Sequence, residues 1–208
     1  MKLSKTLGIS YPAAWHLGHR VRAMMLEANP MLSGVVEIDE MYAGAPPVSR
    51  KGRGTNRPLV LVAAKRSAGV VAKVIPTRWK EAIASALDDV VDQVATVMPD
   101  GLPACKHIGK TQPYLAVNHS VREYARTDAS SGKRIHVSRV ESSNGFMRRA
   151  VTGVFHSISV KHLWRYTGDA TFRRNRKADC CRSGGRGSHT IAFVVIPSFV
   201  SRCQRFFR

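Results

Sequence analysis

Runs of apolar residues in the first half of the chain predict a sheet with one crossover helix. Residues 35–44 (VVEIDEMYAG) form a β-branched run, and the apolar runs at residues 57–66 and 69–77 are separated by a short turn sequence. Two such runs around a tight turn are typical of an antiparallel hairpin. Residues 79–93 place apolar side chains at helical spacing, and residues 94–101 (VATVMPDG) form a fourth apolar run. The predicted order is strand, strand, strand, helix, strand.

The first 28 residues predict two helices. A short helix is followed by a turn at Gly8 to Pro12 and by a longer helix that repeats apolar residues at helical spacing. Two interpretations are open: the second half of a helix-turn-helix, or an amphipathic helical hairpin that packs on the core. Arg20 and Arg22, on the polar side of the longer helix, favour DNA binding.

Two more helices are predicted in the second half of the chain. Residues 135–150 (IHVSRVESSNGFMRRA) contain Ser138 and, three residues later, Glu141, which is the spacing of a capping box at a helix N-terminus. Residues 161–175 (KHLWRYTGDATFRRN) show the pattern of a basic amphipathic helix.

The charge of the chain indicates a polyanionic partner. The 208 residues include 33 Lys and Arg against 14 Asp and Glu, which gives a net charge of +19 at pH 7. An anionic partner is the simplest reason for such an excess, so nucleic acid is the first candidate and an anionic membrane surface the second. From Lys133 to Lys177 there are eleven basic residues and only two acids, Glu141 and Asp169. The isolation of Glu141 in this basic segment suggests a specific role.

Other function classes lack their sequence motifs. The cysteines, Cys105, Cys180, Cys181 and Cys203, have neither zinc-ligand spacing nor the pattern of a disulfide framework. The chain also shows no Gly-rich phosphate loop, no secretory signal and no apolar run close to the ~20 residues that span a bilayer. We therefore expect free thiols, no membrane partner, and a cytoplasmic location at the nucleoid.

An acidic residue inside the first predicted strand is the first candidate for chemistry. Asp39 lies between the apolar residues Ile38 and Met41, where a carboxylate is costly unless a cation or hydrogen-bond donors compensate it. Strand alternation places Glu37 and Asp39 on one face and Glu40 on the other, so Glu37 and Asp39 could both approach a metal ion. The alternative for each single acid is a solvated strand edge or a partner for one of the many arginines.

Asp100 and Glu141 complete a candidate metal site. Asp100 follows the fourth predicted strand, at the carboxyl end where ligands gather. The first and fourth strands are neighbours in the predicted topology, which brings Asp39 and Asp100 within reach of one cation, and the helix of Glu141 can supply a third carboxylate. Hard cations such as Mg²⁺ prefer oxygen ligands, and two of them ~3.5–4 Å apart stabilise the attacking and leaving oxygens of phosphoryl transfer.

Four segments carry a family resemblance: EIDEMYAG (37–44), VNHSVREYAR (117–126), HVSRVESSNGFMRRAVTGVFHSISVKHLWRY (136–166) and FRRNRK (172–177). Together they resemble the DDE transposases of bacterial insertion sequences, in the group with an N-terminal zinc ribbon and a helix-turn-helix. The resemblance covers about residues 1–177. It implies an α/β fold of the ribonuclease H-like type, in which a mixed sheet with flanking helices is preceded by a partial helix-turn-helix.

The resemblance also implies a reaction and a site. Asp39, Asp100 and Glu141 would be the catalytic, metal-binding triad, holding two ions of Mg²⁺ or Mn²⁺. The implied activity is strand cleavage and strand transfer at transposon ends, with transposon-end and target DNA as partners and a homo-oligomer on paired ends. Arg148 stands where the family has a basic residue. The residues expected to contact DNA are Arg148, Arg149, His156, Lys161, His162 and Arg165.

Three departures from the family bear on activity and on domain boundaries. The zinc ribbon is missing because the chain begins within the helix-turn-helix, Ser138 stands where an Asn is usual, and residues 178–208 do not resemble the family. We expect a copy truncated at its N-terminus and altered at its C-terminus, with a partial helix-turn-helix at 1–30, a catalytic domain at 31–177 and a divergent basic tail at 178–208. Two alternatives stay open: a truncated remnant that binds DNA without cutting it, and a basic structural protein of ribosome or chromatin type.

Overall fold

The computed structural model describes residues 2–26, 31–43, 58–66, 69–75, 80–100, 112–155 and 158–182. The chain divides into two compact units, Met1–Ala178 and Asp179–Arg208, and the sheet belongs to the first. None of the helices in the described ranges has the length and hydropathy needed to cross a membrane. Beyond Arg182, the expected basic tail lies outside the described residues.

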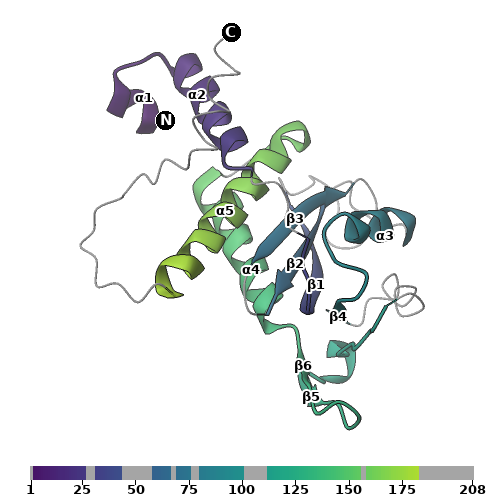
Figure 1. Ribbon diagram of the computed structural model, residues 1–208. Coiled ribbons are helices and arrows are strands. Elements are labelled where there is room, and N and C mark those ends of the chain that lie inside the picture. Colours follow the sequence, from purple (N-terminus) through teal and green to yellow (C-terminus); the bar gives the residue numbers. More distant parts are fainter. Residues whose placement is uncertain are drawn as a thin grey trace. The chain divides into compact units, whose positions relative to one another are not determined.

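A four-stranded mixed sheet forms the centre of the first unit (Figure 1). Its strands are β1 (Val35–Tyr42), β2 (Leu59–Lys65), β3 (Val70–Ile75) and β4 (Thr96–Pro99). The spatial order is β3-β2-β1-β4, with antiparallel pairing of β1 to β2 and of β2 to β3, and parallel pairing of β1 to β4. The predicted meander and the predicted neighbourhood of the first and fourth strands are confirmed.

The crossover helix, α3 (Lys80–Asp88), ends earlier than its apolar pattern predicts. After α3 the backbone pairs with Leu32, whose N–H donates to the Val90 carbonyl at 2.8 Å and whose carbonyl accepts from the Asp92 N–H at 2.9 Å. Val90 is buried in this extended arrangement, so the apolar pattern is satisfied without a helix. The prediction of a helix to residue 93 is therefore wrong, because these backbone groups bond outside the helix.

The sheet separates two apolar cores. Val36 and Ile38 of β1 belong to a cluster that includes the apolar face of α3. The intervening positions of β1 and β2 face the second core, which is covered by α4 (Ser138–Arg149) and α5 (Leu163–Arg182). Figure 1 shows α3 on one side of the sheet and α4 and α5 on the other. The result is a layered α/β fold of the kind expected from the sequence.

The start of α4 differs from the prediction because the residues before it form a hairpin. β5 (Ala125–Thr127) pairs antiparallel with β6 (Arg134–His136), and the helix begins at Ser138, the residue predicted to be its cap. The N-cap residue is Val137, and it makes no side-chain capping bond. The hydroxyl of Ser138 lies 2.8 Å from Nδ1 of His136. The predicted capping box is therefore wrong, because the serine hydroxyl is engaged by the histidine.

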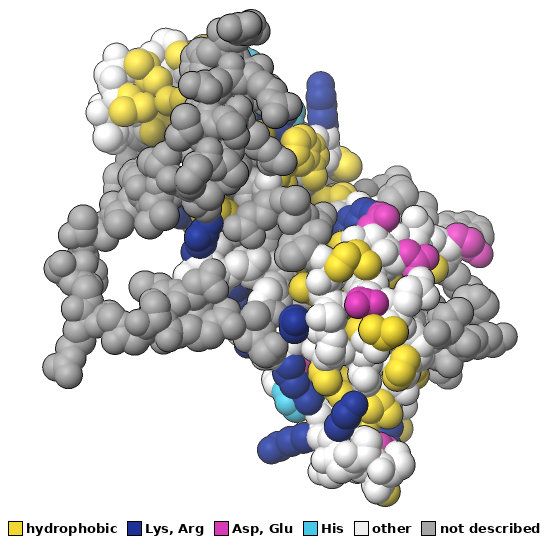
Figure 2. All heavy atoms as spheres, in the orientation of Figure 1, with side chains coloured by type: hydrophobic (Ala, Val, Ile, Leu, Met, Phe, Trp, Pro, Cys, Tyr) yellow, Lys and Arg dark blue, Asp and Glu magenta, His cyan; other side chains and the backbone are white. Residues whose placement is uncertain are grey.

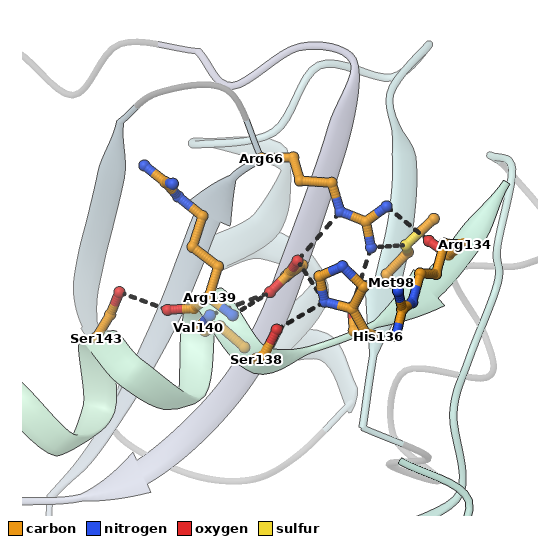
Figure 3. Close-up of polar contacts among 9 residues, drawn as sticks. Arg66, Met98, Arg134, His136, Ser138, Arg139, Val140 and Ser143 are labelled. Atoms are coloured by element: carbon orange, nitrogen blue, oxygen red, sulfur yellow. Dashed lines mark hydrogen bonds and ion pairs between the residues drawn. The ribbon is translucent and has the colours of Figure 1, made fainter. Parts of the chain in front are cut away.

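The first turn of α4 is capped instead by a carboxylate from β1. Oε2 of Glu37 accepts hydrogen bonds from the backbone N–H groups of Arg139 (2.8 Å) and Val140 (3.1 Å). Oε1 of Glu37 lies 3.2 Å from Nε of Arg66 and 3.4 Å from Nδ1 of His136. Figure 3 shows these groups gathered around the carboxylate. Because the Glu37 side chain is 0% exposed, its charge requires these donors, and it fastens the helix N-terminus to the sheet.

α5 confirms the helix predicted for residues 161–175 and protects the free edge of the sheet. A 3₁₀ turn at Val160–His162 leads into α5. The edge strand is β3, and the Val70 N–H donates to Oδ1 of Asn175 at 2.8 Å, while Nδ2 of Asn175 donates to the Val70 carbonyl at 3.1 Å. One amide side chain thus satisfies both backbone groups of a strand residue that has no neighbouring strand on this side.

The N-terminal residues form the two predicted helices, α1 (Lys2–Leu7) and α2 (Tyr11–Met24). Between them, Gly8 has φ +64°, a left-handed conformation that glycine adopts without strain. Ser10 is the N-cap of α2, since its hydroxyl accepts from the Ala13 N–H at 3.4 Å.

Arg22 is one of the residues that join α2 to α5. Nε of Arg22 lies 3.4 Å from Oδ2 of Asp169, and the Arg22 guanidinium lies over the ring of Tyr166 at 4.4 Å. These contacts agree with the interpretation that the N-terminal helices pack on the core. Leu17 and Val21 of α2 stay 38% and 40% exposed, so the opposite face is available to a partner.

Candidate active site

The parallel pairing of β1 and β4 brings two acidic residues together. Ile38 pairs with Pro99 in the register, so the next residues on the two strands are Asp39 and Asp100. Neighbouring strands lie ~4.8 Å apart. A further bridge from Asp100 to Val117 holds the chain in this direction beyond the end of β4. The structure therefore places Asp39 and Asp100 side by side at the carboxyl end of β4.

α4 adds a third acid and an amide from across the sheet. Nδ2 of Asn144 donates a hydrogen bond of 2.6 Å to Oδ2 of Asp39. The other oxygen of Asp39, Oδ1, accepts from the Glu40 N–H at 2.8 Å. Glu141 lies three residues before Asn144, on the same flank of the helix, and is exposed. Asn144 thus connects the helix that carries Glu141 to the strand that carries Asp39.

A histidine lies between the other two acids. Nδ1 of His119 is 3.3 Å from Oδ2 of Asp100 and 3.6 Å from Oε1 of Glu141. The ring of His119 also contacts the ring of Tyr124, with 5.1 Å between centroids. A single histidine has no ligand spacing, so the sequence did not predict a role for His119. Its position in the segment VNHSVREYAR was the only signal for it.

Burial makes the charge of Asp39 costly. Burial is the largest cause that raises the pKa of Asp39, to about 6, and the negative charges of Asp100 and Glu141 raise it further. The hydrogen bond from Asn144 and the positive charge of Arg148 lower it in part. A carboxylate in this environment is stabilised when a cation binds beside it.

The three acids have the chemistry of a site for hard divalent cations, since all of their donor atoms are carboxylate oxygens. In the part of the chain that the structure describes, however, no three His, Cys, Asp or Glu side chains are arranged as a ligand set for one metal ion. Asp39, Asp100 and Glu141 are therefore neighbours whose side chains do not converge on one point.

Glu37 lies on the same face as Asp39 but has a different role. Both of its oxygens are engaged by the start of α4 and by Arg66 and His136, so neither is directed at the other acids. Glu141 belongs to the same first turns of α4 that Glu37 caps. The carboxylate of Glu37 therefore sets the position of Glu141 relative to Asp39.

Two of the basic residues predicted to contact DNA lie at the end of the same helix. Arg148 and Arg149 are exposed in the last turn of α4. Arg148 is seven residues after Glu141 and so lies on the flank that faces Asp39, whose pKa it lowers. The structure thus brings Arg148 to the acidic cluster.

The structure describes three of the other four residues predicted to contact DNA. Lys161 is exposed ahead of α5, while His156 falls outside the described residues. The ring of His162 is 4.6 Å from the ring of His19 on α2, and the guanidinium of Arg165 lies over the ring of Trp164 at 5.0 Å. The structure therefore does not bring His162 and Arg165 to the three acids.

Charged side chains are distributed unevenly over the surface. In Figure 2 the acidic side chains gather over α3, whereas Lys and Arg side chains are more frequent toward α4, β5 and β6. The face visible in Figure 2 thus has an acidic part over α3 and a more basic part toward α4, β5 and β6.

The topology and the acidic cluster are those expected of a ribonuclease H-like enzyme, and the comparison with known families identifies the chain more closely. Residues 31–175 match the ISXO2-like transposase domain, so the chain belongs to this family of transposases. The family expected from the sequence resemblance is confirmed. No curated protein matches the chain.

Solved structures that match the chain include transposases in strand transfer and paired-end complexes. The crystal structure of the Mos1 strand transfer complex has 11% identity and a TM-score of 0.29, covering 82% of this chain and 62% of that chain. The Mos1 paired-end complex with the left transposon end has 14% identity and a TM-score of 0.31, covering 88% and 74%. The Drosophila P element transposase strand transfer complex has 12% identity and a TM-score of 0.28, covering 95% and 57%. This chain thus spans 62% of the first of these proteins.

Proposed function

We propose that this chain is a DDE transposase that cuts and joins DNA at the ends of an insertion sequence, with Asp39, Asp100 and Glu141 as its catalytic carboxylates. The observation that carries the proposal is the adjacency of a half-buried Asp39 and Asp100, the residues that follow the paired Ile38 and Pro99 on parallel strands, next to the helix of Glu141. Membership of a transposase family favours this function over that of a basic structural protein.

The donor chemistry of the three acids suits Mg²⁺ or Mn²⁺, and two ions are proposed. When bound, such ions would activate the attacking oxygen and stabilise the leaving oxygen of the phosphodiester. The raised pKa of Asp39 supports this assignment, because a cation would relieve the repulsion among the acids. The side chains of the acids would then turn toward a common centre.

Three other side chains of the site have supporting roles in this proposal. Asn144 orients Asp39 through its 2.6 Å hydrogen bond, and His119 positions Asp100 and Glu141 through contacts with both. Arg148 contacts the phosphate next to the cut, since a guanidinium binds phosphate oxygens with charge-assisted hydrogen bonds. Transposon-end and target DNA are the partners, and the working form is a homo-oligomer on paired ends.

The test is strand cleavage of DNA that carries the coding region with its natural flanks, in Mg²⁺ or Mn²⁺. Asp39→Asn, Asp100→Asn and Glu141→Gln are expected to lower the rate at least ~100-fold, because each removes a group that acts in the transition state. Asp88→Asn on α3 is the matched control and should cut normally, since Asp88 is exposed on the opposite side of the sheet.

Wild-type cleavage by Asp39→Asn would refute the assignment of the triad. If neither the wild type nor any variant cuts DNA in the presence of metal ions, but all of them bind DNA, the chain is a transposase remnant that binds without cutting.

A further inference from the structure

Three arginines gather on the flank of α4 that faces away from Asp39. Arg139 and Arg149 belong to α4, and Arg174 belongs to α5. Nη2 of Arg174 donates a hydrogen bond of 3.0 Å to Oγ of Ser142. The positions 139, 142 and 149 are three and seven residues apart, so their side chains share one helical face. We call Arg139, Arg149 and Arg174 the arginine cluster.

A glycine in α4 makes room for one of these guanidiniums. A Cβ atom on Gly145 would lie 3.6 Å from Nη1 of Arg149, so the Arg149 side chain runs back along the helix over this position. Glycine inside a helix costs ~1 kcal/mol relative to alanine. The space that Gly145 leaves beside Ser142 is therefore occupied by a cation, and the same stretch of α4 receives Arg174 from the other helix.

The positive charges of the cluster are not balanced by acids in the described part of the chain. None of the ion pairs among the described residues involves Arg139, Arg149 or Arg174. Nε of Arg139 is buried without a hydrogen-bond partner among those residues, and Figure 3 shows its guanidinium extending away from Arg66 and His136. Burial, followed by the charges of Arg139 and Arg149, lowers the pKa of Arg174.

Such an arrangement is unfavourable in the free protein and favourable around an anion. Like charges on one helix face repel, and a buried donor without a partner costs free energy. Guanidinium groups are planar forks that match phosphate oxygens two at a time, and Oγ of Ser142 offers a further polar group at the same place. An anion with several oxygens would satisfy all of these groups.

We propose that Arg139, Arg149 and Arg174 form a binding site for a backbone phosphate of duplex DNA, distinct from the carboxylate site. The proposal rests on the proposed function, since the DNA is the substrate of that reaction. The two sites flank α4 and are separated by about one helix diameter, ~10 Å. The cluster fixes the DNA across the helix that carries Glu141.

The test measures the binding of a 20-base-pair duplex of arbitrary sequence in EDTA. Fluorescence anisotropy gives the affinity at each of several salt concentrations. The double variant Arg139→Gln, Arg174→Gln should bind ~10-fold more weakly and lose about one unit of the slope of log K against log salt, since one phosphate contact disappears. Arg174→Lys keeps the charge and should retain the slope while losing part of the affinity.

Arg173→Gln is the matched control, because it removes the same charge one residue away on α5. Arg173 forms an ion pair with Asp169, with 2.6 Å between Nε and Oδ1, and is 62% exposed. The affinity of the Arg173→Gln variant for the duplex should stay within about twofold of the wild-type value. The melting temperature of the double variant should not fall, because the removal of two positive charges relieves the repulsion among the arginines. If the cluster had only a structural role, the melting temperature of the double variant would be lower than that of wild type.

A change in affinity no larger than that of Arg173→Gln would overturn the proposal. Loss of binding to a labelled polyglutamate peptide, with DNA binding unchanged, would assign the cluster to an acidic protein instead. The assay contains no metal ion and measures no cleavage. If the double variant loses affinity while the wild-type chain never cuts DNA in a separate cleavage assay, the proposed function fails alone. If the wild-type chain cuts while the double variant binds DNA as well as Arg173→Gln does, this inference fails alone.

Discussion

Asn144 on α4 and Asp39 on β1 are joined by a 2.6 Å hydrogen bond from Nδ2 to Oδ2, across 105 positions of the sequence. Asn144 is 2% exposed, and its Oδ1 has no hydrogen-bond partner among the described residues. A buried amide with one free acceptor beside an acidic cluster is costly for stability alone. The bond therefore suits a role in orienting the carboxylate.

Replacing Asn144 by Ala should separate this role from folding. Asp39 would lose the donor that holds Oδ2, so we expect strand cleavage to fall ~10-fold or more while duplex binding in EDTA stays within about twofold. The free energy of unfolding should fall by ~1–2 kcal/mol, because a hydrogen bond to a charged group is lost. Cleavage rates and chemical denaturation measure the two effects.

Ser143→Ala is the control for Asn144→Ala. Ser143 is also buried on α4, but its hydroxyl donates to the Arg139 carbonyl within the helix at 2.9 Å. We expect Ser143→Ala to cut DNA at the wild-type rate. Equal cleavage by Asn144→Ala and wild type would show that the bond to Asp39 is structural only.

The pKa of Asp39 predicts a pH-dependent gain in stability when its charge is removed. The folded-state pKa is about 6 against an ordinary value of 3.8, so folding takes up a proton between these values. Asp39 therefore lowers stability as the pH rises from about 4 to about 6, and the full penalty is present above 6. Asp39→Asn removes this penalty, and Asn144 can turn its free oxygen toward the new amide.

In EDTA, the Asp39→Asn protein should thus be more stable than wild type by ~1–2 kcal/mol at pH 8. A fully buried group would contribute ~1.4 kcal/mol for each unit of its pKa shift, and the gain is smaller here because solvent screens the charge of Asp39. For a protein of this size that is a rise of roughly 2–6 °C in Tm. The difference should vanish near pH 4. A wild-type protein more stable than Asp39→Asn at pH 8 in EDTA would contradict the prediction.

Divalent cations should reverse this order. A ligand that binds only the folded state at ten times its Kd adds ~1.4 kcal/mol. Mn²⁺ titrated into the wild-type protein should therefore raise its Tm by roughly 3–6 °C, whereas Asp39→Asn should respond little. Asp88→Asn should respond as wild type does. Identical Mn²⁺ responses of Asp39→Asn and wild type would place the metal ions elsewhere.

The sequence predicted those features that depend on neighbouring elements. The runs of Val and Ile define β1 to β4, and one helical crossover makes β1 and β4 neighbours, so the adjacency of Asp39 and Asp100 follows from topology. The alternation of β1 also placed Glu37 and Asp39 on one face correctly. Local pattern carries this information because each apolar run must be buried against the next element.

Features that depend on distant side chains could not be predicted. The cap of α4 comes from Glu37, which lies 102 residues before Arg139, while the local candidate Ser138 bonds to His136. His119 begins a 3₁₀ turn, His119–Val121, and contacts Asp100 and Glu141 from there. Spacing rules describe contacts within one element, and these contacts join different elements.

Replacing Glu37 should weaken the protein through the start of α4. Glu37→Gln keeps an acceptor for the Arg139 N–H but leaves Arg66, which is 27% exposed, without its counter-charge, so we expect the free energy of unfolding to fall by ~1–3 kcal/mol. Glu37→Ala also removes the acceptor and should cost more. Glu81→Gln, an exposed change on α3, should stay within ~0.5 kcal/mol of wild type.

Hydrogen exchange locates the effect of these substitutions. The amides of Arg139 and Val140 bond to Glu37, so in Glu37→Ala they should exchange ~10-fold faster or more, relative to the change in global stability. In Glu37→Gln the exchange should be intermediate, because one carbonyl oxygen remains. Since the same turn carries Glu141, cleavage should fall in the order wild type, Glu37→Gln, Glu37→Ala. Unchanged exchange at both amides in Glu37→Ala would show that α4 starts without this carboxylate.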